Sequence, residues 1–294
     1  MRQPGRAYLS LVVASLLFGA TFVVVKEAIA TLPPLAFVGW RFLLGAVVIL
    51  LLAVPRGWPM WRDGALAGTL LFAGYAFQTE GLARTTASNS GLITGLYVVL
   101  TPLLAALVTR RSVGHFVTRG VVLAFAGLAL LTVGDQGLAP QWGDGLTLAC
   151  ALAFAAHIVF LSRKALHHPV VPFTGVQLAT VAALSLGASA LLEGLPLPAR
   201  AVWGALLVTG VAVSAGAFLL QVWSQTVVGP SRTAIVLALE PAFAAVFAAW
   251  LLEERLTTTG WVGAGLILAG IYLVLVLADQ SRDLPLAEAV SPAH

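Results

Sequence analysis

The sequence has very few charged residues for a protein of its length. Only 10% of its 294 residues are Asp, Glu, Lys or Arg, whereas 60% are hydrophobic, and the mean hydropathy is +0.97. Soluble domains contain about 25% charged residues, so this chain has too little polar surface to face water. The composition excludes a soluble protein and indicates a membrane protein.

Cysteine is also nearly absent, and so are the motifs of enzymes. The single cysteine, Cys150, excludes an intramolecular disulfide. The five histidines show no metal-ligand spacing, and the chain contains no G-x-S-x-G, H-E-x-x-H or P-loop sequence. The net charge of +4 does not predict nucleic-acid binding, because the basic residues lie singly or in pairs between apolar runs. We therefore expect no catalytic site, no metal, no cofactor and no nucleic acid; the oligomeric state stays open, a monomer included.

What the sequence has in excess is long apolar runs, of which we count ten. They cover 8–25, 35–54, 65–83, 90–108 and 117–133 in the first half, and 145–161, 171–192, 202–223, 233–252 and 261–277 in the second. Most approach the ~17–25 residues that a helix needs to cross about 30 Å of hydrocarbon. The polar segment 279–294 predicts a disordered tail. The sequence therefore predicts an all-α polytopic membrane protein with ten transmembrane helices.

Loop lysines and arginines predict the orientation in the membrane. If the N-terminus is cytoplasmic, eleven of them lie on the cytoplasmic side, and the opposite side holds only Lys26, Arg84, Arg200 and Arg255. We therefore expect both termini, and with them the tail, on the cytoplasmic side.

The two halves of the sequence repeat each other. The aligned pairs are Phe18 with Phe154, Thr21 with His157 and Arg41 with Gln177 at a spacing of 136 residues, and Gln78 with Gln221 at a spacing of 143. Each half contains five spans, so the second copy starts on the opposite side of the membrane. We predict two inverted five-helix repeats, 1–137 and 138–278, an architecture typical of secondary transporters with a substrate site near the membrane midplane.

Two stretches carry a family resemblance: ASNSGLITGLYVVLTPLLAAL from Ala87 and LALEPAFAAVFAAWLLEERLT from Leu237. With the ten-helix plan, they resemble the drug/metabolite transporter superfamily in its two-repeat EamA-type branch. Within that branch, the chain looks like bacterial exporters of amino acids, including aromatic ones, in the cell inner membrane. The sequence TRRSVGHF from Thr109 departs from the family, because it lacks the Glu-Arg-Leu-like turn that commonly closes the fourth helix.

Polar and aromatic side chains inside the spans predict a cavity, because the bilayer tolerates polar groups only where they face protein or water. On the fourth span, for example, Ser90, Thr94, Tyr97 and Thr101 recur every three or four residues and share one helix face. We expect the first, third, fourth, sixth, eighth and ninth helices to line this cavity. The candidate lining residues are Phe18, Thr21, Tyr75, Gln78, Ser90, Thr94, Tyr97, Thr101, Phe154, His157, Phe218, Gln221, Thr233 and Glu240.

Other residues in the spans predict helix geometry. Pro102 and Pro241 should kink the fourth and ninth helices. Two small-residue pairs, Gly64 with Gly68 and Gly91 with Gly95, predict close helix contacts. The neighbouring charges Glu80 and Arg84 favour an interfacial pair.

Three ionisable side chains each have a structural and a functional interpretation. Three interpretations of Glu240 stay open: a neutral hydrogen-bond donor beside the kink, a proton carrier, or half of a buried ion pair with Arg41. Arg41 pairs with that carboxylate or a helix-end carbonyl, or it attracts a substrate carboxylate. His157 is either a satisfied core residue or part of the cavity.

Together these patterns predict a secondary transporter that exports small metabolites, with amino acids that have apolar or aromatic side chains as the first candidates. Its partners are then a small-molecule substrate and the lipid bilayer. One alternative is a drug or other metabolite exporter of the same fold. Another is a non-transporting membrane scaffold or a subunit of an intramembrane enzyme, against which the inward polar faces argue.

The orientation can be tested with reporter fusions. Reporters fused after Arg62 and after Arg282 should be cytoplasmic, and one fused after Arg200 periplasmic, because of the charge distribution over the loops. A periplasmic signal from the C-terminal fusion would contradict both the ten-helix count and the inverted repeat.

Overall fold

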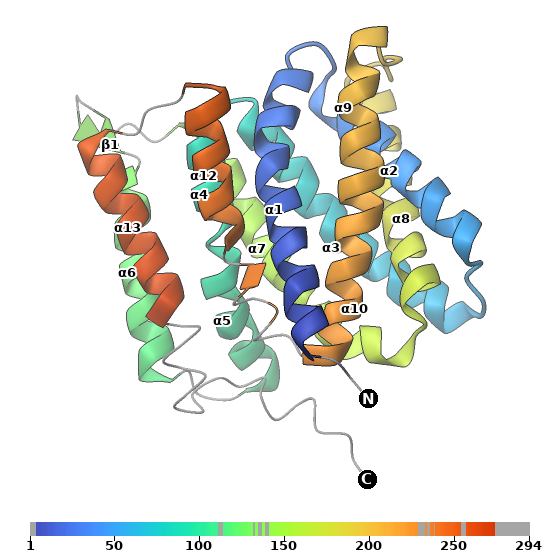
Figure 1. The fold of residues 1–294 in the computed structure, drawn as a ribbon, viewed down its shortest axis with the longest axis horizontal. Coiled ribbons are helices and arrows are strands. Elements are labelled where there is room, and N and C mark those ends of the chain that lie inside the picture. The colour runs from blue at the N-terminus through green and yellow to red at the C-terminus, as the bar shows by residue number, and fades with distance from the viewer. Residues whose placement is uncertain are drawn as a thin grey trace.

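The computed structural model describes residues 4–110, 114–131, 133–134, 137–138, 141–228, 233, 236–237, 239–253 and 257–273. The predicted tail, 279–294, lies outside the described residues. Within them, the helices form a bundle in which successive spans run in opposite directions (Figure 1). We call the end of the bundle at which α1 begins the N-terminal end, and the opposite one the far end.

The elements follow the order expected from the apolar runs. The first half contains α1 (Pro4–Ala28), α2 (Pro34–Leu52), α3 (Trp58–Leu82), α4 (Ala87–Thr94), α5 (Tyr97–Thr109) and α6 (His115–Leu131). The second half contains α7 (Trp142–Lys164), η1 (Ala165–His167), α8 (Val170–Leu192), η2 (Arg200–Val202), α9 (Trp203–Leu207), the π-helical segment η3 (Val208–Ala217), α10 (Phe218–Val228), α12 (Leu239–Leu251) and α13 (Thr258–Tyr272).

These elements make ten helical spans, since α4 with α5 and η2 with α9, η3 and α10 each form one. Among the described residues, six helical stretches are long and apolar enough to cross a membrane, and α12 and α13 are shorter apolar helices. The predicted all-α, ten-helix membrane protein is therefore confirmed. One element was not predicted, a small antiparallel hairpin of β1 (Val133–Gly134) and β2 (Gly137–Leu138) between the two halves.

Exposed tryptophans lie at both ends of the bundle. This residue gathers at membrane–water interfaces, because its ring is apolar and its N–H is polar. Trp58 and Trp61 lie at the N-terminal end, at the start of α3. The far end has Trp142, Trp203, Trp250 and Trp261. The two groups mark the borders of the apolar layer.

The fourth span is interrupted at Gly95 and Leu96, between α4 and α5, and the kink expected at Pro102 stays a prediction. At the interruption the backbone tightens, and Leu96 N–H donates to the carbonyl of Ile93 over 3.0 Å. Pro102 lies inside α5. The interruption coincides with a helix crossing, since a Cβ added to Gly95 would lie 2.3 Å from Cγ of Pro241.

Pro241 lies in α12, and residues 236 and 237 before it are helical as well. Because proline has no N–H, the Leu237 carbonyl, four residues earlier, receives no helical hydrogen bond from it. Residue 238, just before this helix, lies outside the described residues. The kink expected at Pro241 therefore stays a prediction.

Both predicted small-residue pairs make close helix contacts. A Cβ added to Gly68 on α3 would lie 2.7 Å from the carbonyl oxygen of Gln177 on α8. One added to Gly91 on α4 would lie 2.5 Å from Cβ of Ala244 on α12. At both crossings only glycine allows the helix backbones to approach this closely.

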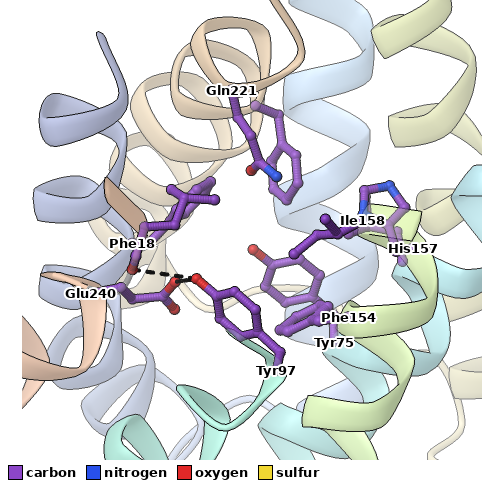
Figure 2. A pocket seen from close by; sticks show the side chains of 11 residues that line it. Phe18, Tyr75, Tyr97, Phe154, His157, Ile158, Gln221 and Glu240 are labelled. Atoms are coloured by element: carbon purple, nitrogen blue, oxygen red, sulfur yellow. Dashed lines mark hydrogen bonds between the residues drawn. The ribbon is translucent and has the colours of Figure 1, made fainter. Parts of the chain in front are cut away.

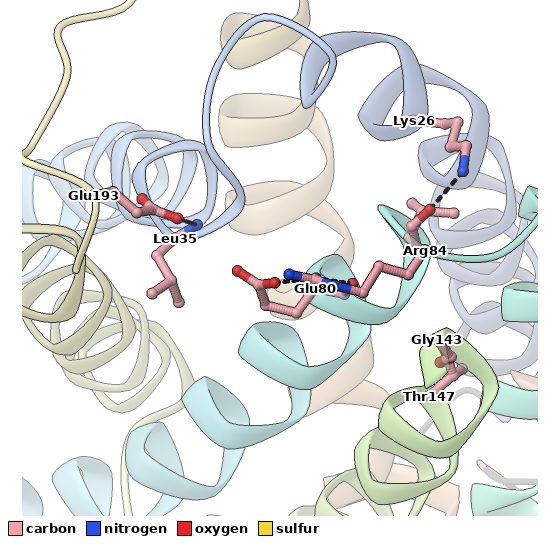
Figure 3. A network of polar contacts seen from close by, with 8 residues as sticks. Lys26, Leu35, Glu80, Arg84, Gly143, Thr147 and Glu193 are labelled. Carbon is pink, nitrogen blue, oxygen red and sulfur yellow. Dashed lines mark hydrogen bonds and ion pairs between the residues drawn. The ribbon is translucent and has the colours of Figure 1, made fainter. Parts of the chain in front are cut away.

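At the far end, side chains form hydrogen bonds with backbone groups at the ends of helices that are distant in the sequence (Figure 3). The Glu193 carboxylate, at the end of α8, accepts from the backbone N–H of Leu35 at 2.9 Å and of Ala36 at 2.8 Å. It thereby caps the start of α2 and complements the helix dipole there. Lys26 Nζ donates to the Leu82 carbonyl at the end of α3 over 2.6 Å. These bonds join α8 to α2 and α1 to α3 at one end of the bundle.

The predicted pair of Glu80 and Arg84 is confirmed as an ion pair one helical turn apart (Figure 3). At the N-terminal end, the buried carboxylate of Asp63 lies 3.2 Å from both Lys164 Nζ and His168 Nε2. This cluster ties the start of α3 to the connection between α7 and α8.

Helices α6 and α13 lie side by side at one edge of the bundle (Figure 1), joined through glycines of both. A Cβ added to Gly127 would lie 2.5 Å from the Gly263 carbonyl oxygen, and one added to Gly270 would lie 2.5 Å from that of Gly120. The two contacts are reciprocal, as a repeat requires, since the sequence aligns Gly120 with Gly263.

This packing predicts that Gly270→Ala destabilises the protein. The added methyl group must push two helix backbones apart, which costs about 1–3 kcal/mol. Gly265→Ala, on the same helix, is the matched control, because an added Cβ there meets no atom within 4 Å. Thermal unfolding in detergent should show a lower midpoint for Gly270→Ala alone; equal midpoints would contradict the contact.

Candidate functional site

A pocket lies between the two halves of the bundle (Figure 2). It encloses about 360 Å³ of space free of atoms, part of it continuous with the outside. The lining residues are Phe18, Leu71, Tyr75, Tyr97, Phe154, His157, Ile158, Phe218, Gln221, Leu237 and Glu240. They come from the six spans that the sequence predicts, the first, third, fourth, sixth, eighth and ninth.

The aromatic walls of the pocket are built from equivalent positions of the two repeats. The ring of Phe18 meets that of Phe218 edge to face, with centroids 5.2 Å apart. The ring of Tyr75 meets that of Phe154 in the same way, also at 5.2 Å. Phe18 aligns with Phe154 in the sequence, and at the spacing of 143 Tyr75 aligns with Phe218. The two contacts are therefore copies of one another, and the pocket lies where the repeats meet.

A carboxylate and a hydroxyl form one polar edge of the pocket (Figure 2). The hydroxyl of Tyr97 lies 3.1 Å from Glu240 Oε2 and 3.3 Å from the Leu237 carbonyl oxygen. Because the hydroxyl has one proton, it donates fully to only one of them at a time. Glu240 is only 7% exposed, and in the described part of the chain no cation forms an ion pair with it.

The buried ion pair between Glu240 and Arg41, one of the alternatives from the sequence, is not formed. The Arg41 guanidinium instead packs against the rings of Phe42 and Tyr75 and donates from Nε to Ser214 Oγ over 3.2 Å. The carboxylate thus has a single hydroxyl as its side-chain partner.

His157 combines its two interpretations. Its Nε2 lies 3.0 Å from Oε1 of Gln177, so the imidazole is satisfied by a core amide. The same side chain lines the pocket (Figure 2). An amide oxygen only accepts, so Nε2 carries the ring proton and Nδ1 is the acceptor nitrogen.

The structure brings eight of the predicted residues to the pocket and leaves six beside it. Thr21, Gln78, Ser90, Thr94, Thr101 and Thr233 do not line it. Several bond locally instead: Gln78 Nε2 donates to Thr94 Oγ1 over 3.4 Å, and Thr101 donates to the Tyr97 carbonyl over 2.6 Å. The second of these bonds is made to the backbone of a lining residue, Tyr97.

Three lining residues were missed because they are aliphatic: Leu71, Ile158 and Leu237. A criterion of polar or aromatic character could not select them among so many apolar residues. Their spacing was a usable signal, because each lies one, three or four residues from a predicted residue and hence on or beside the same helix face.

Comparison with known proteins gives a consistent result. The model of the EamA-like transporter family matches residues 5–133 and 141–276. An uncharacterized transporter of Archaeoglobus fulgidus is 36% identical over 283 residues, covering 91% of this chain and 85% of the relative. A WAT1-related chloroplastic protein of Arabidopsis thaliana is 25% identical over 279 residues, covering 87% of this chain and 66% of the relative. A solved structure named "Crystal structure of protein" shares the fold, with a TM-score of 0.69 at 20% identity, and covers 94% of this chain and 98% of its own.

The pocket predicts different roles for the two repeat-related amides. Gln221→Leu should lower solute exchange in proteoliposomes several-fold, because it removes a polar lining group, and change the free energy of unfolding by no more than about 1–2 kcal/mol. Gln78→Leu is the matched control: it breaks the bond to Thr94 outside the pocket and should change exchange less. Equal losses of folding and exchange in both variants would indicate that both amides are structural.

Proposed function

Because the chain belongs to the EamA-like transporter family, we propose that it exports small metabolites, foremost amino acids with apolar or aromatic side chains. The pocket is the substrate site in this proposal, and the two repeats expose it alternately to the two sides of the membrane. The proposal places the protein in a bacterial inner membrane with cytoplasmic termini.

The observation that carries this proposal is the composition of the pocket. Aromatic rings from both halves enclose it, and they can bury an apolar side chain, which contributes about 1.5–3 kcal/mol. Polar groups at its edges, Gln221, Tyr97 and Glu240, can orient the polar end of the solute. A small amphipathic molecule meets both requirements.

One observation favours the second candidate, an exporter of drugs or other cationic metabolites. Glu240 is the one carboxylate of the lining, and no cation among the described residues neutralises it. A cationic amphipathic drug could supply the missing positive charge. The family consists of transporters and not of enzymes, which removes the scaffold and enzyme-subunit alternatives.

Transport by the purified protein in proteoliposomes decides between the two candidates. A panel of labelled amino acids and cationic drugs is measured with and without a pH gradient. Uptake of leucine, phenylalanine or tryptophan above that of empty liposomes supports the proposal. Uptake of the cationic drugs alone would replace it with drug export.

The contact between Glu240 and Tyr97 makes a prediction about proton coupling. If Glu240 is a neutral structural group, Glu240→Gln should keep both exchange and the response to a pH gradient, because glutamine preserves the shape and accepts from the same hydroxyl. We expect this result in paired exchange and gradient-driven uptake assays. A variant that exchanges normally but no longer responds to the gradient would identify Glu240 as the proton carrier.

A further inference from the structure

Arg41 brings a positive charge into the core of the bundle without a negative one to oppose it. Its side chain is 1% exposed, and Nη2 has no hydrogen-bond partner. In the described part of the chain, no carboxylate forms an ion pair with it. Arginine keeps its charge in proteins, and buried charges are normally paired.

The groups that do surround the guanidinium compensate only part of this cost. Its central carbon lies 5.1 Å from the centroid of Phe42 and 5.0 Å from that of Tyr75. Such contacts stabilise a cation by less than its burial costs. Nε donates to Ser214 Oγ, and the polar end of the Tyr75 side chain is a further neighbour of the guanidinium, but Nη2 has no partner. An anion that bonds to Nη2 would supply the negative charge and the hydrogen-bond acceptor that the protein does not provide.

The second repeat shows that the fold does not require a cation at this position. Gln177 aligns with Arg41 and is also 1% exposed. Its amide is satisfied, since Oε1 lies 3.0 Å from His157 Nε2 and its own Nε2 donates to the Phe173 carbonyl over 3.4 Å. A neutral, fully bonded amide therefore suffices in one half, and the other half has a cation with a free N–H. Packing alone gives no reason for the difference.

Arg41 does not line the pocket itself. Its guanidinium packs against the ring of Tyr75, which does line the pocket, so a solute in the pocket reaches Nη2 only when that ring moves. The pocket thus has Arg41 behind its Tyr75 wall and Glu240 at a separate polar edge.

We propose that Arg41 binds the carboxylate of the exported substrate. The carboxylate meets Nη2 at the Tyr75 side of the pocket, and the apolar part of the solute lies among the aromatic rings. This inference rests on the proposed function and narrows it: solutes with a free carboxylate are bound, and their amides, esters and cationic amphipathic analogues are not.

The test compares an acid with its neutralised analogue in proteoliposomes that contain the full chain. Unlabelled phenylalanine and unlabelled phenylalaninamide are compared as competitors of the exchange of labelled phenylalanine. Leucine and leucinamide are compared in the same way. Wild type should prefer each acid by about tenfold or more, the value of one lost charge-assisted hydrogen bond. Arg41→Gln, which copies the second repeat, should reduce this preference to about onefold, because glutamine recognises an acid and an amide alike.

Arg56→Gln is the matched control, because it removes an exposed cation from the connection that follows α2 and should keep the preference for the acid. If Arg41→Gln does not fold, Arg41→Lys preserves the charge but loses the planar fork, and the preference should fall several-fold without disappearing. An undiminished preference in whichever of these two variants folds would overturn the inference.

The wild-type measurements separate the inference from the function on which it rests. Exchange of acid and amide with equal affinity would overturn the role of Arg41 and leave export of apolar solutes intact. A complete lack of amino-acid exchange, with uptake of cationic drugs, would overturn the proposed function itself.

Discussion

Inside a bilayer a polar group finds no water, so the protein must supply its hydrogen-bond partners. Much of this structure follows from that constraint. Glu193 caps the start of α2, and Lys26 donates to the carbonyl of Leu82, the last residue of α3, because helix ends that meet inside a bundle leave N–H and C=O groups open. A group that escapes the constraint is then informative, and the Nη2 of Arg41 is such a group.

The pocket follows from the repeat as much as from its individual residues. When two copies of a helix unit pack around a common axis, equivalent positions face one another, which explains the matched ring contacts of Phe18 with Phe218 and of Phe154 with Tyr75. The polar groups do not match in this way. Arg41 corresponds to Gln177. Glu240 aligns with Tyr97 at the spacing of 143 residues, or with Thr101 where Pro102 is matched to Pro241, and neither is a carboxylate. The repeat therefore builds the walls of the pocket, and differences between the copies give it charge.

Family membership and pocket chemistry answer different questions. The match over 5–133 and 141–276 shows a transporter, but relatives in an archaeon and a plant share that fold without sharing a stated substrate. Substrate choice depends on which side chains reach the pocket. In our proposal this choice depends on Glu240 and Gln221 in the lining and on Arg41 beside Tyr75, since the aromatic walls would accept many apolar solutes.

The sequence by itself determined the membrane class, the ten helices, the six spans that line the pocket and the contacts at Gly68 and Gly91. These follow from the length of apolar runs and from helical periodicity, which are local properties. The ion pair of Glu80 and Arg84 was equally predictable, because four residues separate them on one helix. Only the tertiary structure decided that the fourth span breaks at Gly95 against Pro241, and that Arg41 packs on Tyr75 and not on Glu240. Those outcomes depend on neighbours that are distant in the chain, and a pattern of residue types carries no information about which of several possible partners lies within a few ångströms.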